Sequence, residues 1–100
     1  MISLFLLIMK GQYILKKEGQ KLLRVYTDYE NNILLGVKIT GDFFMHPEES
    51  ISYIEKNLIG TKIVFQELVS RINNIIAAYD IKIYGITADS IAESIIGCVK

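Results

Sequence analysis

The sequence is poor in the residues that build metal centres, disulfides and nucleophilic active sites. It contains one cysteine, Cys98, and one histidine, His46, in 100 residues. A lone cysteine excludes a disulfide within the chain, which suits a reducing compartment. One histidine and one cysteine, far apart in sequence, give neither metal-ligand spacing nor a nucleophile–base motif. We therefore expect no catalytic residue and no metal site, and we interpret His46 as a residue just before a helix.

The net charge of the chain is also close to zero. The 11 basic and 11 acidic side chains balance, whereas domains that bind nucleic acid usually present a basic face. We therefore expect no nucleic-acid partner. The apolar fraction of 51% lies slightly above the usual range, which fits a domain that buries part of its surface against another protein.

An almost wholly apolar segment, Met1 to Met9, opens the sequence. It is far shorter than the roughly 20 residues that a transmembrane helix needs. It also lacks the preceding basic residues and the small-residue cleavage site of a signal peptide. Residues 1–10 are interpreted as an apolar extension: an extra edge strand, a start codon upstream of the true one, or a tail that packs on a partner. We expect a cytoplasmic protein with no membrane association.

Two segments alternate between apolar and polar residues, as strands with one buried face do. They span residues 22–30 and 33–40, and Asn31 and Asn32 lie between them. Asparagine tolerates the positive φ angles of a tight turn, so the pattern predicts an antiparallel hairpin. A short β-prone segment at residues 12–16 precedes it. The residues expected on the buried face are Leu23, Val25, Thr27 and Tyr29, and then Ile33, Leu35, Val37 and Ile39.

Apolar residues at helical spacing predict a first helix between Pro47 and Gly60. Proline suits the first position of a helix, and glycine suits the position just after its end. The two glutamates that follow Pro47 would lie in the first turn, where the helix dipole favours negative charge. Thr61 is expected to cap a second helix, whose apolar stripe runs over residues 65–79.

The last predicted elements are a short strand and a third helix. Residues 80–84 form a short Ile-rich run that Gly85 ends, and Thr87 is expected to cap the helix that follows. This order predicts an α+β fold: a small, mainly antiparallel sheet (an N-terminal hairpin or meander) with about three helices packed on one face. Residues 1–100 are interpreted as a single domain. The expected buried face of the last helix is Ile91, Ala92, Ile95, Ile96 and Val99.

The most unusual stretch is the expected connection between the hairpin and the first helix. It consists of Gly41, Asp42, Phe43 and Phe44. A connection from strand to helix is normally polar, so two adjacent phenylalanines need a reason. Each phenylalanine either fills the core at this connection or faces a partner. Gly41 and Asp42 are expected to shape the turn, with the Asp42 side chain accepting hydrogen bonds from backbone N–H groups.

A charged loop over residues 16–21 is the second candidate site. Its side chains Lys16, Lys17 and Lys21 could offer ammonium groups to a phosphate. The alternative interpretation is a solvated loop between two strands.

The stretch around Gly41 resembles the C-terminal accessory domain of lipoate–protein ligases. In that family a hairpin ends in Ile/Val-x-Gly-Asp-Phe-Phe, a helix then ends in Leu-x-Gly, and a second amphipathic helix follows. The corresponding parts here are residues 39–44, 58–60 and 65–78, and residues 86–92 resemble the family's last helix. The resemblance covers residues 11–99, and residues 1–10 have no counterpart.

The resemblance implies a non-catalytic accessory subunit that forms a heterodimer with a catalytic large subunit. That complex would use ATP and Mg²⁺ to activate lipoate to lipoyl-AMP. It would then transfer the lipoyl group to a lysine of acceptor proteins, such as E2 subunits and the glycine-cleavage H protein. This chain alone would bind no cofactor and supply no catalytic residue.

Within the resemblance, Phe43 and Phe44 are the first candidates for contact with the large subunit. The lysines of residues 16–21 are weaker candidates for approach to the ATP phosphates. Two other interpretations stay open: an independent α+β interaction module unrelated to lipoate, and a small enzyme. The missing nucleophile, metal site and acid–base pair disfavour the enzyme.

Overall fold

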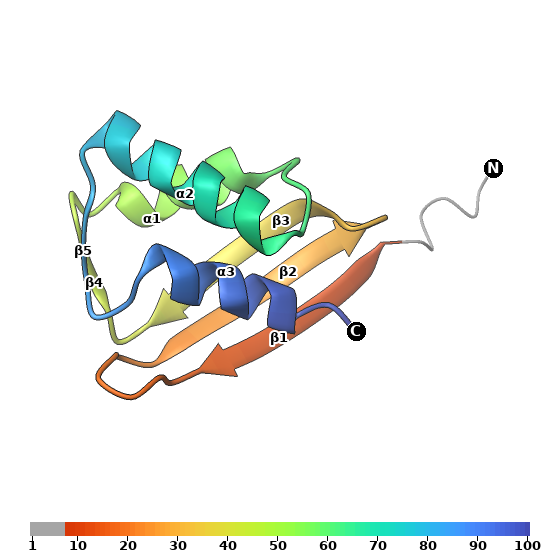
Figure 1. Ribbon diagram of the computed structural model, residues 1–100, viewed down its shortest axis with the longest axis horizontal. Helices are drawn as coiled ribbons and strands as arrows, with labels where there is room; N and C mark the ends of the chain where they lie inside the picture. The colour runs from red at the N-terminus through yellow and green to blue at the C-terminus, as the bar shows by residue number, and fades with distance from the viewer. Residues whose placement is uncertain (1–7) are drawn as a thin grey trace.

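The computed structural model describes residues 8–100 and shows the expected α+β fold (Figure 1). The apolar extension proposed for residues 1–10 lies largely outside the described residues, and the first strand begins at Met9. Among residues 8–100, no helix combines the length and the apolar character needed to cross a membrane. The elements are β1 (Met9–Leu15), β2 (Leu23–Glu30), β3 (Ile33–Gly41), β4 (Phe44–His46), α1 (Ser50–Leu58), α2 (Phe65–Tyr79), β5 (Lys82–Tyr84) and α3 (Ala88–Gly97).

Strands β1, β2 and β3 form an antiparallel sheet in that order, with the three helices on one face (Figure 1). The hairpin between β2 and β3 is confirmed, because Asn31 and Asn32 adopt φ angles of 50° and 62° at its turn. The alternation expected in β2 is confirmed as well. Its inward side chains Leu23, Val25, Thr27 and Tyr29 are all buried.

The alternation expected in β3 is wrong at Leu35. Asp28 pairs with Gly36 while Tyr29 pairs with Leu34, so Leu35 is an extra residue without a partner in β2. Such a β-bulge reverses the direction of the side chains that precede it. Leu34 is therefore fully buried, and Leu35 is 39% exposed.

Side chains from the sheet and from all three helices form the hydrophobic core. Helix α1 packs on β3, α3 packs on β2 and β1, and α2 contacts both of these helices. Each fully buried leucine or isoleucine contributes about 1.5–3 kcal/mol of transfer free energy. The stripe expected on α2 is buried at Leu68, Ile72 and Ile75, but Tyr79 at its end is 42% exposed. Ile96 of α3 is 37% exposed and does not belong to the buried face. The fully buried large residues include Leu23, Leu34, Ile54, Leu58, Leu68, Ile72, Ile91 and Ile95.

Helix α1 begins later than expected. His46 is still in strand β4, where it pairs with Lys82, so the chain has to turn before a helix can start. Residues 47–49 make that turn, and the Ser50 N–H donates to the Pro47 carbonyl at 3.0 Å. Consequently no acidic residue lies in the first helical turn. The expected helix end is confirmed, since Gly60 follows α1 with φ of 91°.

Thr61 does not cap α2, whose N-cap position is held by Val64. Residues 60–63 instead run beside the start of β3. The Leu34 N–H donates to the Thr61 carbonyl at 2.9 Å, and the Gly60 N–H donates to the Leu34 carbonyl at 2.7 Å. The backbone of this connection therefore covers one end of the β3 edge.

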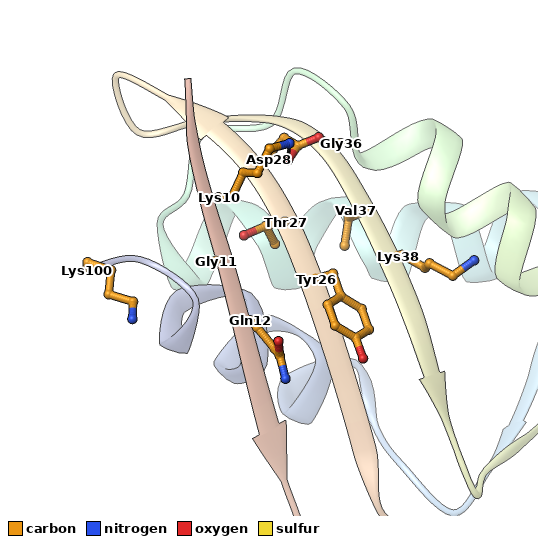
Figure 2. Close-up of a pocket in the computed structure, with 10 residues that line it drawn as sticks. All are labelled: Lys10, Gly11, Gln12, Tyr26, Thr27, Asp28, Gly36, Val37, Lys38 and Lys100. Carbon is orange, nitrogen blue, oxygen red and sulfur yellow. Dashed lines mark hydrogen bonds and ion pairs between the residues drawn. The ribbon is translucent and has the colours of Figure 1, made fainter. Parts of the chain in front are cut away.

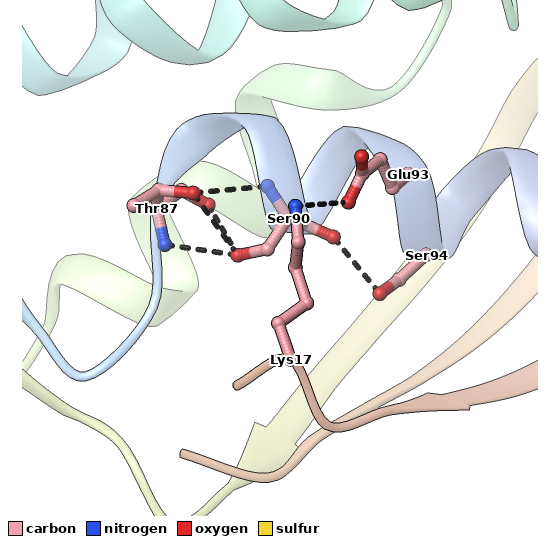
Figure 3. Close-up of polar contacts among 5 residues, drawn as sticks. All are labelled: Lys17, Thr87, Ser90, Glu93 and Ser94. Atoms are coloured by element: carbon pink, nitrogen blue, oxygen red, sulfur yellow. Dashed lines mark hydrogen bonds and ion pairs between the residues drawn. The ribbon is translucent and has the colours of Figure 1, made fainter. Parts of the chain in front are cut away.

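Helix α3 begins as expected, with Thr87 as its N-cap (Figure 3). The Ser90 N–H donates to Thr87 Oγ1 at 3.1 Å, and the Thr87 N–H donates to Ser90 Oγ at 2.9 Å. This reciprocal pair is a capping box, which satisfies two backbone donors at the helix start. Asp89 lies in the first turn, where the helix dipole favours its charge.

Candidate functional site

The structure brings the two candidate groups of the sequence together at one end of the molecule (Figure 1). The Lys21 N–H donates to the Gly85 carbonyl at 2.7 Å, and the Asp42 N–H donates to the Leu22 carbonyl at 3.0 Å. Three segments that are distant in sequence therefore meet there. We call residues 16–22, 41–46 and 82–87 together the corner.

Glycine is required where these segments touch. A Cβ atom on Gly41 would lie 2.2 Å from the Leu22 carbonyl oxygen, and one on Gly85 would lie 2.7 Å from the Lys21 Cγ atom. Both glycines also adopt positive φ angles, of 151° and 101°, which other residues rarely reach. The two glycines let the three segments approach closely.

Phe44 lies in a strand rather than in the expected connection from strand to helix. Strand β4 pairs antiparallel with β5, and this pairing sets Phe44 opposite Tyr84. The two ring centroids are 5.9 Å apart, with an interplanar angle of 31°. Phe44 is 56% exposed and Tyr84 is 55% exposed. The pair is thus an apolar patch on the surface of the corner.

Phe43 and Phe44 divide between the two alternatives left open by the sequence. Phe43 is partly buried and packs against the hydrophobic core, whereas Phe44 faces outward. The Asp42 side chain is exposed, and among the described residues its carboxylate accepts no hydrogen bond. The turn is held by the backbone of Asp42 and by Gly41, rather than by the Asp42 side chain.

The three lysines of residues 16–21 differ in their surroundings. Lys17 Nζ lies 2.9 Å from Glu93 Oε1, which fastens the loop to α3 (Figure 3). Lys16 and Lys21 are exposed, and within residues 8–100 neither forms an ion pair with a carboxylate. The aromatic pair is therefore accompanied by two cations that remain available to a partner.

The described residues offer little for chemical catalysis. His46 is exposed on β4, whereas Cys98 is buried in the core. Burial raises the pKa of the Cys98 thiol, which donates a hydrogen bond to the Val25 carbonyl at 3.6 Å. Within residues 8–100, no group of three or more His, Cys, Asp or Glu side chains is placed to hold a metal ion. The corner instead presents exposed aromatic rings and exposed lysines.

A shallow hollow of about 620 Å³ lies on the outer face of the sheet, opposite the helices (Figure 2). Gly36 contributes to it by lacking a side chain, and Tyr26 and Lys38 lie beside it. Lys10 and Asp28 also line it, and they neutralise each other in an ion pair of 2.9 Å. The hollow is open and shares no residue with the corner.

Sequence reasoning did not single out Tyr84. The short strand that contains it was expected, but its pairing with β4 was not. That pairing joins residues about 40 positions apart. A regular alternation of exposed and buried residues over three positions is too short to indicate a partner strand.

The fold and this surface define a small α+β domain that presents an exposed aromatic pair. Residues 22–95, which are more than half of the chain, match the family model described as the bacterial lipoate protein ligase C-terminus. The chain therefore belongs to the lipoate protein ligase C-terminal family. The resemblance carried by the Gly41 stretch is confirmed.

Comparison with curated sequences and comparison with solved structures both give a match from Thermoplasma acidophilum. The chain is 40% identical over 60 residues to lipoate-protein ligase A subunit 2, which covers 60% of this chain and 57% of that protein. The match thus spans little more than half of the relative's length. The fold is similar to one chain in a solved structure of a bi-partite lipoate protein ligase and its E2 lipoyl domain. That match has a TM-score of 0.74 and 26% identity, and it covers 87% of this chain and 94% of the other.

Proposed function

We propose that this chain is the accessory subunit of a two-component lipoate–protein ligase. The observation that carries the proposal is the family match over residues 22–95. The similarity to subunit 2 of the Thermoplasma ligase supports it. The catalytic large subunit would activate lipoate to lipoyl-AMP and pass the lipoyl group to a lysine of an acceptor protein, such as an E2 subunit or the glycine-cleavage H protein.

The contribution of this chain would be conformational. The accessory subunit docks over the nucleotide end of the large subunit's pocket, orders its loops and excludes water from the acyl-adenylate. ATP, Mg²⁺ and lipoate then belong to the large subunit's pocket, and no acidic cluster among residues 8–100 is placed to bind the metal. The chain thus supports adenylation without supplying a reacting group.

Docking would be anchored by Phe44 and Tyr84. Interface energy concentrates in a few residues, and large aromatic side chains are over-represented among them. The two rings are already held against each other, so their ordering costs little entropy on binding. Phe43 would support the anchor from the core side.

Lys16 and Lys21 would approach the phosphates of ATP or acidic groups of the large subunit. Lys17 is less suited to this role because Glu93 already neutralises it. A double variant with Lys16→Ala and Lys21→Ala should raise the KM for ATP in the complex. Lys62→Ala, an exposed lysine outside the corner, is the matched control and should leave the KM unchanged.

The main test is lipoate-dependent exchange between ATP and pyrophosphate. We expect no exchange with this chain alone and restored exchange when it is mixed with the large subunit of the same organism. Gel filtration of the mixture should show a stable complex. Equally fast exchange by the large subunit alone would overturn the accessory role.

The alternative is an interaction module unrelated to lipoate. It predicts no complex with the large subunit and no effect on exchange. The family match argues against it. Adenylate formation by this chain alone would instead favour an enzyme.

A further inference from the structure

The two edges of the three-stranded sheet are treated differently. The outer edge of β3 is covered by the rest of the protein: the Ile39 N–H donates to Glu55 Oε2 at 2.8 Å, and the connection after α1 pairs with Leu34. These contacts satisfy backbone groups that would otherwise be open to a second strand. The β3 edge is therefore protected near both of its ends, at Leu34 and Ile39.

The opposite edge, formed by β1, has no such cover in the part of the chain that the structure describes. All seven residues of β1 pair with β2 in regular register, without a bulge and without a proline. Between residues 8 and 100, the β1 backbone forms hydrogen bonds with β2 only. Helix α3 covers the inner face of β1, where Tyr13 lies against Gly97, and leaves the edge open. Figure 1 shows β1 at this edge, with β2 between it and β3.

The side chains of β1 indicate what the edge would accept. Met9 is 47% exposed and Ile14 is 50% exposed, which favours apolar side chains on an added strand. Residues 8–17 contain three lysines and no carboxylate. Lys10 pairs with Asp28 and Lys17 pairs with Glu93, which leaves Lys16 without a carboxylate partner among residues 8–100. A second copy of β1 has no carboxylate to offer Lys16, whereas a strand with a carboxylate would complement it.

The β1 edge is continuous with the corner. Strand β1 ends at Leu15, and the chain passes directly into the loop of residues 16–21. A segment lying along β1 would thus arrive beside Lys16, in the loop whose Lys21 N–H donates to the Gly85 carbonyl next to Tyr84. One partner can therefore occupy both surfaces.

We propose that β1 accepts an extended segment of the catalytic large subunit, which adds a fourth strand to the sheet. The segment alternates apolar residues with at least one carboxylate that faces Lys16. The backbone hydrogen bonds of such a strand supply affinity, and alternate side chains supply specificity. This inference rests on the proposed heterodimer.

Hydrogen–deuterium exchange of the full chain, free and in complex with the large subunit, tests the proposal. We expect amides within residues 9–15 to exchange at least about tenfold more slowly in the complex, since new hydrogen bonds protect them. Peptides covering residues 34–39 are the internal control, because that edge is already covered. Their exchange should change little.

Two variants at one exposed position add a test of charge. Ile14→Asp should weaken the complex by roughly tenfold, a typical effect at an important interface residue, because it places like charge beside the partner's carboxylate. Ile14→Lys should bind at least severalfold more tightly than Ile14→Asp. Leu35→Asp, at an exposed leucine of β3, is the control and should bind like the unmodified chain. Thermal unfolding of each free variant separates lost binding from lost folding.

The outcomes are distinct. If the complex forms and supports exchange of pyrophosphate but β1 stays unprotected, strand addition is wrong and the accessory role stands. Equal binding of the two Ile14 variants also contradicts the proposed acidic partner. Protection of residues 9–15 in the free chain that rises with its concentration would mean that a second copy occupies the edge. Absence of both complex and activity would overturn the two proposals together.

Discussion

Phe44 and Tyr84 lie opposite each other in the two-stranded sheet, with ring centroids 5.9 Å apart, and each is more than half exposed. Each ring limits the motion of the other on the protein surface. Replacing one of them therefore changes both the apolar area of the patch and the order of the remaining ring. A substitution in this pair can therefore change the affinity for a partner while it changes the free energy of unfolding only a little.

Phe44→Ala should keep the fold and weaken the complex with the large subunit. The exposed side chain contributes mainly its ring pair, so the free energy of unfolding should fall by about 0.5–1.5 kcal/mol. Binding should weaken by at least about tenfold if the ring anchors the interface. Urea denaturation and titration calorimetry measure the two effects.

Phe43→Ala is the matched control at the adjacent position. Its ring packs against the core, so its removal should lower stability more than the removal of Phe44. A loss of roughly 2–4 kcal/mol is expected for a partly buried phenylalanine. Equal stability losses in the two variants would contradict the division between core and surface.

Gly41→Ala should destabilise the protein strongly. The new Cβ would overlap the Leu22 carbonyl oxygen, and the positive φ angle adds strain. We expect a loss of at least about 2 kcal/mol, as for overpacked sites. Gly19→Ala is the control: its φ is also positive, but no atom lies within 4 Å of the new methyl group. Its loss should therefore be about 1 kcal/mol, and chemical denaturation measures both variants.

Glu55→Ala should lower the free energy of unfolding by about 1–3 kcal/mol. The substitution leaves the Ile39 N–H without its carboxylate partner, and an unsatisfied buried donor is costly. Glu55→Gln retains an oxygen acceptor and should recover part of the loss. Faster amide exchange at Ile39 in the alanine variant, measured by NMR, would link the loss to this hydrogen bond. Unchanged exchange there would contradict it.

Cys98 should react slowly with a thiol reagent in the folded protein and quickly in urea. Burial raises the pKa of its thiol, so the folded state holds the proton more tightly than the unfolded state does. Its contribution to stability is complete below the unfolded-state pKa of about 8.5 and is lost as pH rises through the folded-state value. Between pH 8 and pH 10, the unmodified protein should lose more stability than Cys98→Ala, and urea titrations at several pH values compare the two.

Local patterns predicted most of the elements. The alternation in residues 22–30, the paired asparagines and the Thr87 cap each depend on neighbouring residues, and all three are confirmed. The predicted start of α1 is wrong. Pro47 satisfies the local rule for a first helical position, but the helix begins at Ser50. The deciding contact, between β4 and β5, comes from a distant part of the chain.

The same distinction applies to the candidate site. The sequence singled out residues 16–21 and residues 41–44 separately, but it could not show that they meet. Their meeting depends on Gly85, whose carbonyl binds the Lys21 N–H across more than 60 residues. Exposure divides Phe43 from Phe44, and it too follows from tertiary packing, since the two residues are chemically identical.

The unpaired Leu35 in β3 has a consequence for comparing this chain with its relatives. A bulge is a place where a strand holds one residue more than its partner needs. Deleting that residue would restore regular pairing and leave Leu34 and Gly36 opposite their present partners. Relatives with a regular hairpin are therefore expected to align with a single-residue gap at position 35, and insertions or deletions of one residue should be tolerated there better than anywhere else in β3.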